Sequence, residues 1–227
     1  MNVQAKQKFR WNDVSTLRII VSILGILVGF AGFEHGFFEI LQGNVIPNEF
    51  VIDAIGPGQR FWSEGTEPAF TIIPNYFITG ILAMSIGLLM IIWAALFIER
   101  KYGVRILFLL SITLFLVGGG FAPLPVALLA SFVATSINSP LNWWRTHLPE
   151  NIQNMLVKLW PWNVIVAVFL FLFAVFVAIF GYPIIWFLSA ELTVSFNLII
   201  GLIDLGIMVI SILSAISYGI QSSPDSN

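Results

Sequence analysis

Three ionisable residues, Glu34, His35 and Glu39, lie within six positions at the end of an apolar run that begins near Leu17. An imidazole beside carboxylates can relay protons, hold a cation or act as an acid and base. At 100° per residue, His35 and Glu39 lie four apart on one helix face, while Glu34 points roughly opposite. We therefore expect His35 and Glu39 to face a bundle interior, and Glu34 to pair with the loop that follows or with Arg60.

A second acid lies in the last apolar run of the chain. Asn197, Gly201 and Asp204 follow spacings of four and three, so they fall on one helical stripe. An ionisable side chain within a membrane span is costly unless it faces a partner or a water-filled cavity. The sequence therefore predicts that the first and last spans share one polar cavity. Its candidate residues are His35, Glu39, Asn197, Asp204 and Glu34.

The composition is that of an integral membrane protein. Hydrophobic residues make up 58% and charged residues 10% of the 227 residues, against about 45–50% and about 25% in soluble domains. The apolar runs leave almost no chain for a soluble domain, so we expect one membrane domain over 1–227. The chain has no cysteine, which excludes disulfides, thiolate catalysis and cysteine-ligated metal centres.

The apolar runs predict an all-α, polytopic transmembrane bundle of six spans, at about 17–42, 75–98, 105–119, 124–139, 163–181 and 192–219. As one helix, the third and fourth spans would reach about 51 Å, against a hydrocarbon core of about 30 Å. The triplet Gly118 to Gly120, with Pro123 and Pro125, favours a break instead. Five spans is the alternative.

The distribution of basic residues predicts the orientation. With six spans and both termini inside, nine of the ten Lys and Arg residues fall on the inner side and only Arg60 lies outside. Cytoplasmic loops collect Lys and Arg, whereas the five-span alternative gives about seven to three. We therefore expect a multi-pass protein of the cell membrane with both termini cytoplasmic.

Two segments outside the spans are distinctive. The loop 43–74 combines four acids with several prolines and many apolar residues, so we expect an ordered cap on the outer face. The segment 140–162 mixes tryptophans with Arg145, His147 and Lys158. Tryptophan with basic residues marks the headgroup layer, so this segment predicts a cytoplasmic interfacial helix.

Small residues form a stripe on the first span. Its members, at spacings of four, three and four, are Gly25, Gly29, Gly32 and Gly36. Stripes of this kind let a neighbouring helix approach closely. We expect such a contact beside the polar cluster.

Two short resemblances accompany these patterns. The His35-x-x-x-Glu39 spacing is similar to the catalytic His and Glu pair on a helix of sterol-isomerase-type membrane enzymes, which implies an acid and a base acting on a lipid. The Leu17-Arg18-Ile19 start and the glycine-rich first helix resemble the DoxX-like small membrane proteins. This resemblance assigns no role to any residue of this chain.

Three function classes fit the sequence. We favour transport of a proton, ion or small solute, in which intramembrane acids bind the cargo. The alternatives are an accessory subunit of a larger membrane complex and, least favoured, a membrane enzyme acting on a lipid or isoprenoid beneath the loop 43–74. The catalytic residues of such an enzyme are unknown.

The sequence also limits which cofactors, metals and partners the protein is expected to bind. His35 and His147 are the only histidines and fall on opposite sides of the predicted membrane, which argues against a bis-His haem or a His-rich metal site. No dinucleotide, hydrolase or metalloprotease motif and no basic groove for nucleic acid is present. We predict no cofactor, no metal and no nucleic acid. The expected partner is the lipid bilayer, with membrane-protein partners or a homo-oligomer.

Overall fold

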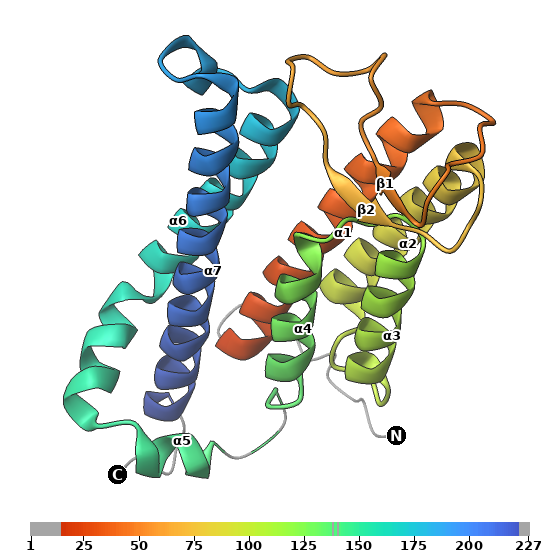
Figure 1. Cartoon of the computed structure of the whole chain (residues 1–227). Helices are drawn as coiled ribbons and strands as arrows, with labels where there is room; N and C mark the ends of the chain where they lie inside the picture. The colour runs from red at the N-terminus through yellow and green to blue at the C-terminus, as the bar shows by residue number, and fades with distance from the viewer. Residues whose placement is uncertain (1–14, 138, 140, 223–227) are drawn as a thin grey trace, which may run out of the picture.

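The computed structural model describes residues 15–137, 139 and 141–222. It is mostly helical (Figure 1), and in chain order its elements are α1 (Thr16–Leu41), β1 (Val51–Asp53), β2 (Pro68–Phe70), α2 (Tyr76–Leu96), α3 (Gly103–Leu116), α4 (Pro123–Ala134), α5 (Asn142–His147), α6 (Glu150–Phe180), the 3₁₀ turn η2 (Ile184–Trp186) and α7 (Ala190–Gln221). Four helices, α1, α2, α6 and α7, are long and apolar enough to cross a membrane. These helices fit a multi-pass membrane protein, as the composition predicts.

The predicted break between the third and fourth spans is present. Helix α3 ends at Leu116 and α4 begins at Pro123, where the missing proline N–H is tolerated because a first-turn N–H has no partner within its helix. The two helices have 14 and 12 residues, or about 21 and 18 Å, which is shorter than a hydrocarbon core of about 30 Å. They form a short hairpin (Figure 1), so six full spans are not shown.

The glycine stripe of α1 packs against α2, as predicted. A Cβ on Gly29 would lie 2.6 Å from the backbone oxygen of Gly87, and one on Gly36 would lie 2.5 Å from that of Gly80. The two backbones therefore approach more closely than any larger residue would allow.

The segment 140–162 differs from the prediction. Helix α5 covers only part of it, and α6 begins at Glu150 and continues through Pro161 to Phe180. A helix of 31 residues is about 46 Å long, so it exceeds the hydrocarbon core by several turns. Trp160, Trp162 and Lys158 therefore belong to one long helix, and only Trp143 and Trp144, with Arg145 and His147, lie in the short separate helix α5.

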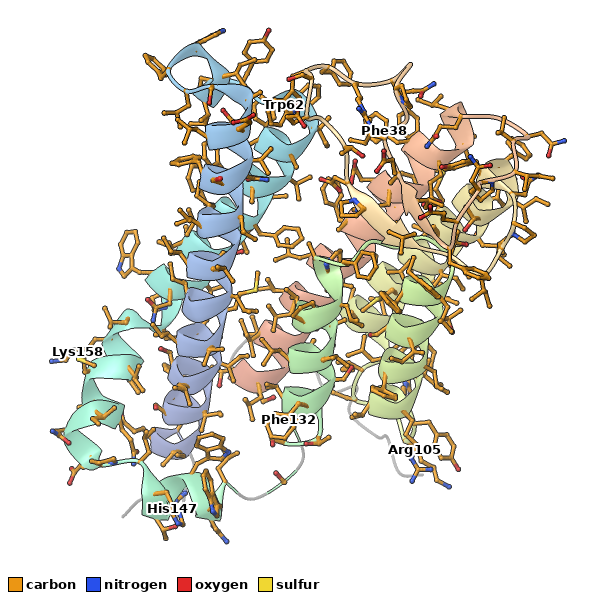
Figure 2. The ribbon with its side chains drawn as sticks, viewed as in Figure 1. Phe38, Trp62, Arg105, Phe132, His147 and Lys158 are labelled. Atoms are coloured by element: carbon orange, nitrogen blue, oxygen red, sulfur yellow. The ribbon has the colours of Figure 1, made fainter. Side chains whose placement is uncertain are left out.

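The loop 43–74 is ordered, as predicted. Strands β1 and β2 pair antiparallel, with Val51 opposite Phe70, and Gly118 N–H donates to the Phe70 carbonyl at 2.9 Å. Trp62 donates from its indole N–H to the Ala178 carbonyl at 3.0 Å, beside the upper end of α6 (Figure 2). The loop thus joins the tip of the α3–α4 hairpin to the end of α6.

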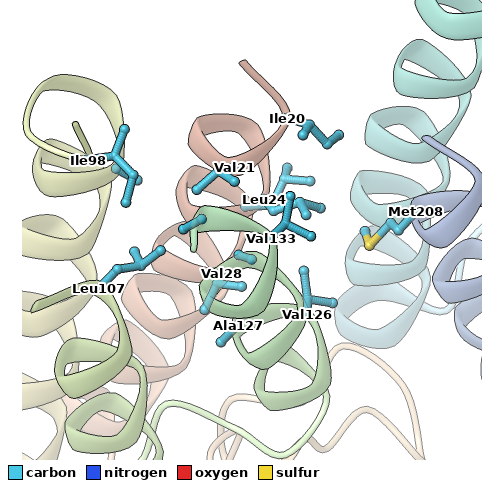
Figure 3. Packing of buried hydrophobic residues seen from close by; sticks show 14 of the residues in the cluster. Ile20, Val21, Leu24, Val28, Ile98, Leu107, Val126, Ala127, Val133 and Met208 are labelled. Atoms are coloured by element: carbon cyan, nitrogen blue, oxygen red, sulfur yellow. The ribbon is translucent and has the colours of Figure 1, made fainter. Parts of the chain in front are cut away.

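An apolar core lies between the helices (Figure 3). It is built from buried side chains of α1, α2, α3, α4, α6 and α7, including Leu24, Val28, Leu107, Val126 and Met208. The buried acids of α1 lie in its last two turns, where the loop covers them. The acids of α1 therefore follow its apolar stretch, at the end of the helix that the loop covers.

One part of the orientation argument lies outside the described residues. Lys6, Lys8 and Arg10 belong to the N-terminal segment that the structure does not describe. The start of α1 and the end of α7 lie at the same end of the molecule (Figure 1), and which side of the membrane this end faces stays a prediction.

Candidate functional site

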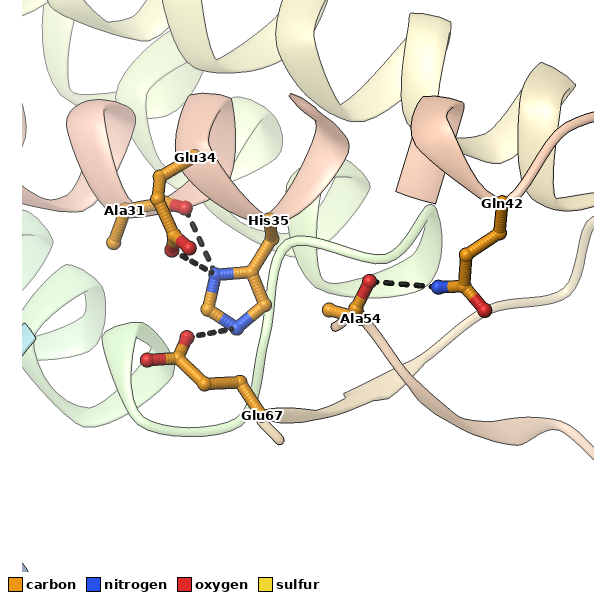
Figure 4. Close-up of polar contacts among 6 residues, drawn as sticks. All are labelled: Ala31, Glu34, His35, Gln42, Ala54 and Glu67. Atoms are coloured by element: carbon orange, nitrogen blue, oxygen red, sulfur yellow. Dashed lines mark hydrogen bonds and ion pairs between the residues drawn. The ribbon is translucent and has the colours of Figure 1, made fainter. Parts of the chain in front are cut away.

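His35 is the centre of a buried polar cluster (Figure 4). Its Nδ1 lies 2.9 Å from the Ala31 carbonyl oxygen and 3.2 Å from Oε2 of Glu34. Its Nε2 lies 2.9 Å from Oε2 of Glu67. The side chains of His35, Glu34 and Glu67 are only 4%, 10% and 14% exposed. The imidazole is therefore held between two carboxylates away from bulk water.

The surroundings of the ring assign its hydrogen. A carbonyl oxygen can only accept, so Nδ1 carries the hydrogen and donates it to Ala31. The second nitrogen, Nε2, faces the Glu67 carboxylate. This bond to the preceding helical turn fixes the ring orientation, with Nε2 directed toward the loop.

Glu67 reaches the cluster from the loop 43–74, directly before β2. Its backbone oxygen accepts a hydrogen bond from Ala54 N–H at 2.8 Å, and Gln42 at the end of α1 donates to the Ala54 carbonyl at 2.7 Å. The loop is thus fastened to the end of α1 on the same side as His35 (Figure 4). From the sequence, Glu67 was one of the four acids of the loop and was not predicted as a site residue. One signal in the sequence pointed to it: the loop has four acids and only one arginine, so at least three of its carboxylates have no basic partner within the loop.

The glycine triplet of the α3–α4 hairpin lines the cluster. Gly118 and Gly120 have φ angles of +99° and +84°, a conformation that side-chain-bearing residues rarely adopt. A Cβ on Gly118 would collide with the Glu39 carboxylate, and one on Gly120 would collide with Nε2 of His35. The triplet was predicted only as a hinge or helix breaker, and in the structure it also makes room for the acid and the imidazole.

Glu39 is buried without a polar partner. Its side chain is 0% exposed, and neither carboxylate oxygen has a hydrogen-bond partner among the described residues. The prediction that His35 and Glu39 face the interior is confirmed by their burial.

The prediction that Glu34 points away from His35 is wrong. The ion-pair distance joins His35 to Glu34 and not to Glu39. Glu34 does lie beside the loop, as expected, but beside Glu67, while Arg60 pairs with Asp53 instead. Adjacent helical positions are only 100° apart, and a flexible glutamate side chain spans that separation.

The candidate residues of α7 lie elsewhere in the described molecule. Asp204 is 3% exposed, and its Oδ1, like Oδ1 of Asn197, has no hydrogen-bond partner among the described residues. Among the described residues, no hydrogen bond or ion pair joins either residue to His35, Glu34 or Glu67. Helices α1 and α7 also diverge toward their upper ends (Figure 1). A cavity shared by the two helices stays a prediction.

The cluster has the atoms of a cation site. Glu34, His35 and Glu67 each offer one ligand atom, and these atoms lie within 4.8 Å of one another. A separate cavity of about 10 Å³ lies on the other side of Gly119 and Gly120; it is lined mainly by apolar side chains of α1, α3 and α4, and the three ligand residues are not part of its lining. The arrangement can hold a small ion.

Comparisons with known protein families, with curated proteins and with solved structures find no match to this chain.

Proposed function

We propose that this protein transports a cation across its membrane and that Glu34, His35 and Glu67 form the binding site. The observation that carries the proposal is the burial of two carboxylates around one imidazole, with one carboxylate supplied by a loop. Intramembrane acids of this kind mark ion pathways in membrane proteins.

The charge of the cluster favours a cation over an anion or a neutral solute. Two carboxylates face a single imidazole, and the carboxylate of Glu39 is buried nearby against Gly118. Removing carboxylates from water costs several kcal/mol unless a positive charge compensates them. A bound cation supplies that compensation directly.

The site is accessible from the side of the loop 43–74, so an ion can enter it from that side. Glu67 lies in the loop and keeps 14% of its side chain exposed, while the apolar core closes the path below the cluster. Exchange with the opposite side requires a rearrangement, and the α3–α4 hairpin is the element we assign to it. Interrupted helices that meet at an ion site serve this purpose in transporters.

The arrangement of the helices also bears on which side of the membrane each end of the protein faces. Because the hairpin returns to the end where it starts, the charge argument for six spans applies equally to four spans and a hairpin. We propose that this end, with both termini, is cytoplasmic and that the loop 43–74 faces outward.

The test is uptake by the purified protein in liposomes. Entry of H⁺, Na⁺ and Zn²⁺ is followed in parallel with a pH-sensitive dye, radioactive sodium and a zinc-sensitive dye. We expect uptake of at least one of these cations, and a loss of about tenfold or more in Glu67→Gln, because the neutral amide removes one of the two charges at the site.

The matched control is Glu64→Gln, which removes an exposed acid from the same loop and should transport at the wild-type rate. Equal uptake by wild type, Glu67→Gln and protein-free liposomes for all three cations would refute the proposed function.

A further inference from the structure

We infer that the cation is a first-row divalent transition-metal ion such as Zn²⁺, held by Nε2 of His35 and by the carboxylates of Glu34 and Glu67. The inference rests on the proposed function in one respect, since it names the chemical class of the transported ion. The binding site itself is argued from the geometry of the three side chains.

The orientation of His35 is that of a metal ligand. A histidine that binds a metal through one nitrogen almost always donates its other N–H to a carbonyl or carboxylate, which fixes the ring. The Nδ1 of His35 makes this bond to the Ala31 carbonyl at 2.9 Å. The other nitrogen, Nε2, lies 2.9 Å from the Glu67 carboxylate, so a metal bound at Nε2 takes the place of the hydrogen that these two groups share, and that proton is released to solvent.

Binding of the ion requires the ligand side chains to shift. In a tetrahedral zinc site with bonds of about 2.0–2.2 Å, ligand atoms lie about 3.3–3.6 Å apart. Nε2 of His35 and Oε2 of Glu67, now 2.9 Å apart, must move slightly apart. The Glu34 carboxylate, which contacts Nδ1 at 3.2 Å, must rotate toward Nε2. One ligand atom from each of the three side chains already lies within 4.8 Å of the others.

A buried carboxylate oxygen of Glu34 without a hydrogen-bond partner is a second, independent indication of a metal site. Glu34 is buried, with 9% of the whole residue exposed, and its Oε1 has no hydrogen-bond partner among the described residues. Buried carboxylate oxygens are normally paired or bound to a metal. Two carboxylates balance the charge of a divalent ion, so the loaded site is neutral within its own ligands.

The donor set selects among metals. An imidazole with two carboxylates suits Zn²⁺, Mn²⁺ or Fe²⁺, whereas Ca²⁺ takes six to eight oxygen ligands and Mg²⁺ keeps a water-rich octahedral shell. The chain has no cysteine, so the thiolates that favour Cu⁺ are missing. Three protein ligands leave one position open, as in sites where the fourth ligand exchanges. This openness agrees with an ion that must leave again.

The test measures binding at equilibrium, without a membrane gradient. Purified full-length protein in detergent is stripped with a chelator and titrated calorimetrically with Zn²⁺, with Ca²⁺ and Mg²⁺ as comparison ions. We expect one Zn²⁺ per chain, no displacement by the comparison ions, and a loss of affinity of about 100-fold or more in His35→Gln and Glu67→Gln. The controls His147→Gln and Glu64→Gln alter exposed residues and should bind as wild type.

A second measurement keeps the inference testable if a variant fails to fold. X-ray absorption of zinc-loaded wild type should show nitrogen and oxygen donors at about 2.0–2.1 Å, including one imidazole. An absence of zinc binding by folded wild type, unchanged affinity in both site variants, or a spectrum without imidazole would each overturn the metal assignment.

The two proposals fail in different ways. Zinc binding without uptake of any cation would keep the metal site and remove the transport function. Uptake of H⁺ or Na⁺ by a protein that binds no zinc would keep transport and remove the metal assignment.

Discussion

The two halves of the molecule, α1 to α4 and α6 with α7, bury their apolar residues to different extents. In the most apolar stretch of α1, 61% of the residues are buried, whereas in that of α6 only 22% are. Helix α1 lies between α2 and the α3–α4 hairpin, where glycines allow backbone contact, while α6 packs chiefly on α7 and exposes large side chains such as Phe169. The more apolar helix is therefore the less buried one, since the mean hydropathy is 3.0 for α6 and 2.1 for α1. The glycines of α1 and of the hairpin allow the close contacts that surround the His35 cluster.

The largest expected effect concerns the glycines of the two halves. Gly36→Ala places a methyl group 2.5 Å from the Gly80 oxygen, so it should lower the free energy of unfolding by about 3 kcal/mol, at the upper end of overpacking effects. Gly201→Ala on α7 meets no atom within 4 Å and should raise it by about 0.5 kcal/mol through helix propensity. Denaturant titration of both variants in detergent measures the difference. Equal effects would show that the close contact of α1 and α2 does not distinguish the halves.

A smaller effect should follow at the glycine triplet. Gly120→Ala and Gly43→Ala both impose a side chain on a positive φ, +84° and +79°, and both should lose about 1–2 kcal/mol of stability through backbone strain. Only the new methyl group at Gly120 collides with His35, since nothing lies within 4 Å of one at Gly43. Cation uptake in liposomes should therefore fall in Gly120→Ala alone. Equal uptake by the two variants would separate the triplet from the site.

The smallest expected effect tests whether α7 takes part. If α1 and α7 share a polar cavity, Asp204→Asn should reduce cation uptake about tenfold, in the same assay and for the same ion as His35→Ala. Glu191→Gln, an exposed acid in the first turn of the same helix, serves as the control. Wild-type uptake by Asp204→Asn would assign transport to the α1–α4 half and leave Asp204 a structural role.

Local features of the sequence determined most of the helical framework. The first span was expected at about 17–42 and is found at Thr16–Leu41, where Ser15 accepts a hydrogen bond from Arg18 N–H and caps the helix. The break at Gly118 to Gly120 and the close contact along the α1 glycines were also predictable. Helix propensity, chain length and residue size act over a few neighbouring positions, so a sequence carries them directly.

The site itself depended on contacts between distant segments. Only the fold of the loop 43–74 brings Glu67 to His35, and only the hairpin places Gly118 and Gly120 against Glu39 and His35. The hydrogen bonds that hold these segments together run between backbone groups of the loop and of the hairpin tip. Every residue type except proline offers the same backbone N–H and C=O groups, so the sequence does not indicate which segments these groups join. Apolar periodicity thus determined where the helices lie, and tertiary packing decided which acids meet the imidazole.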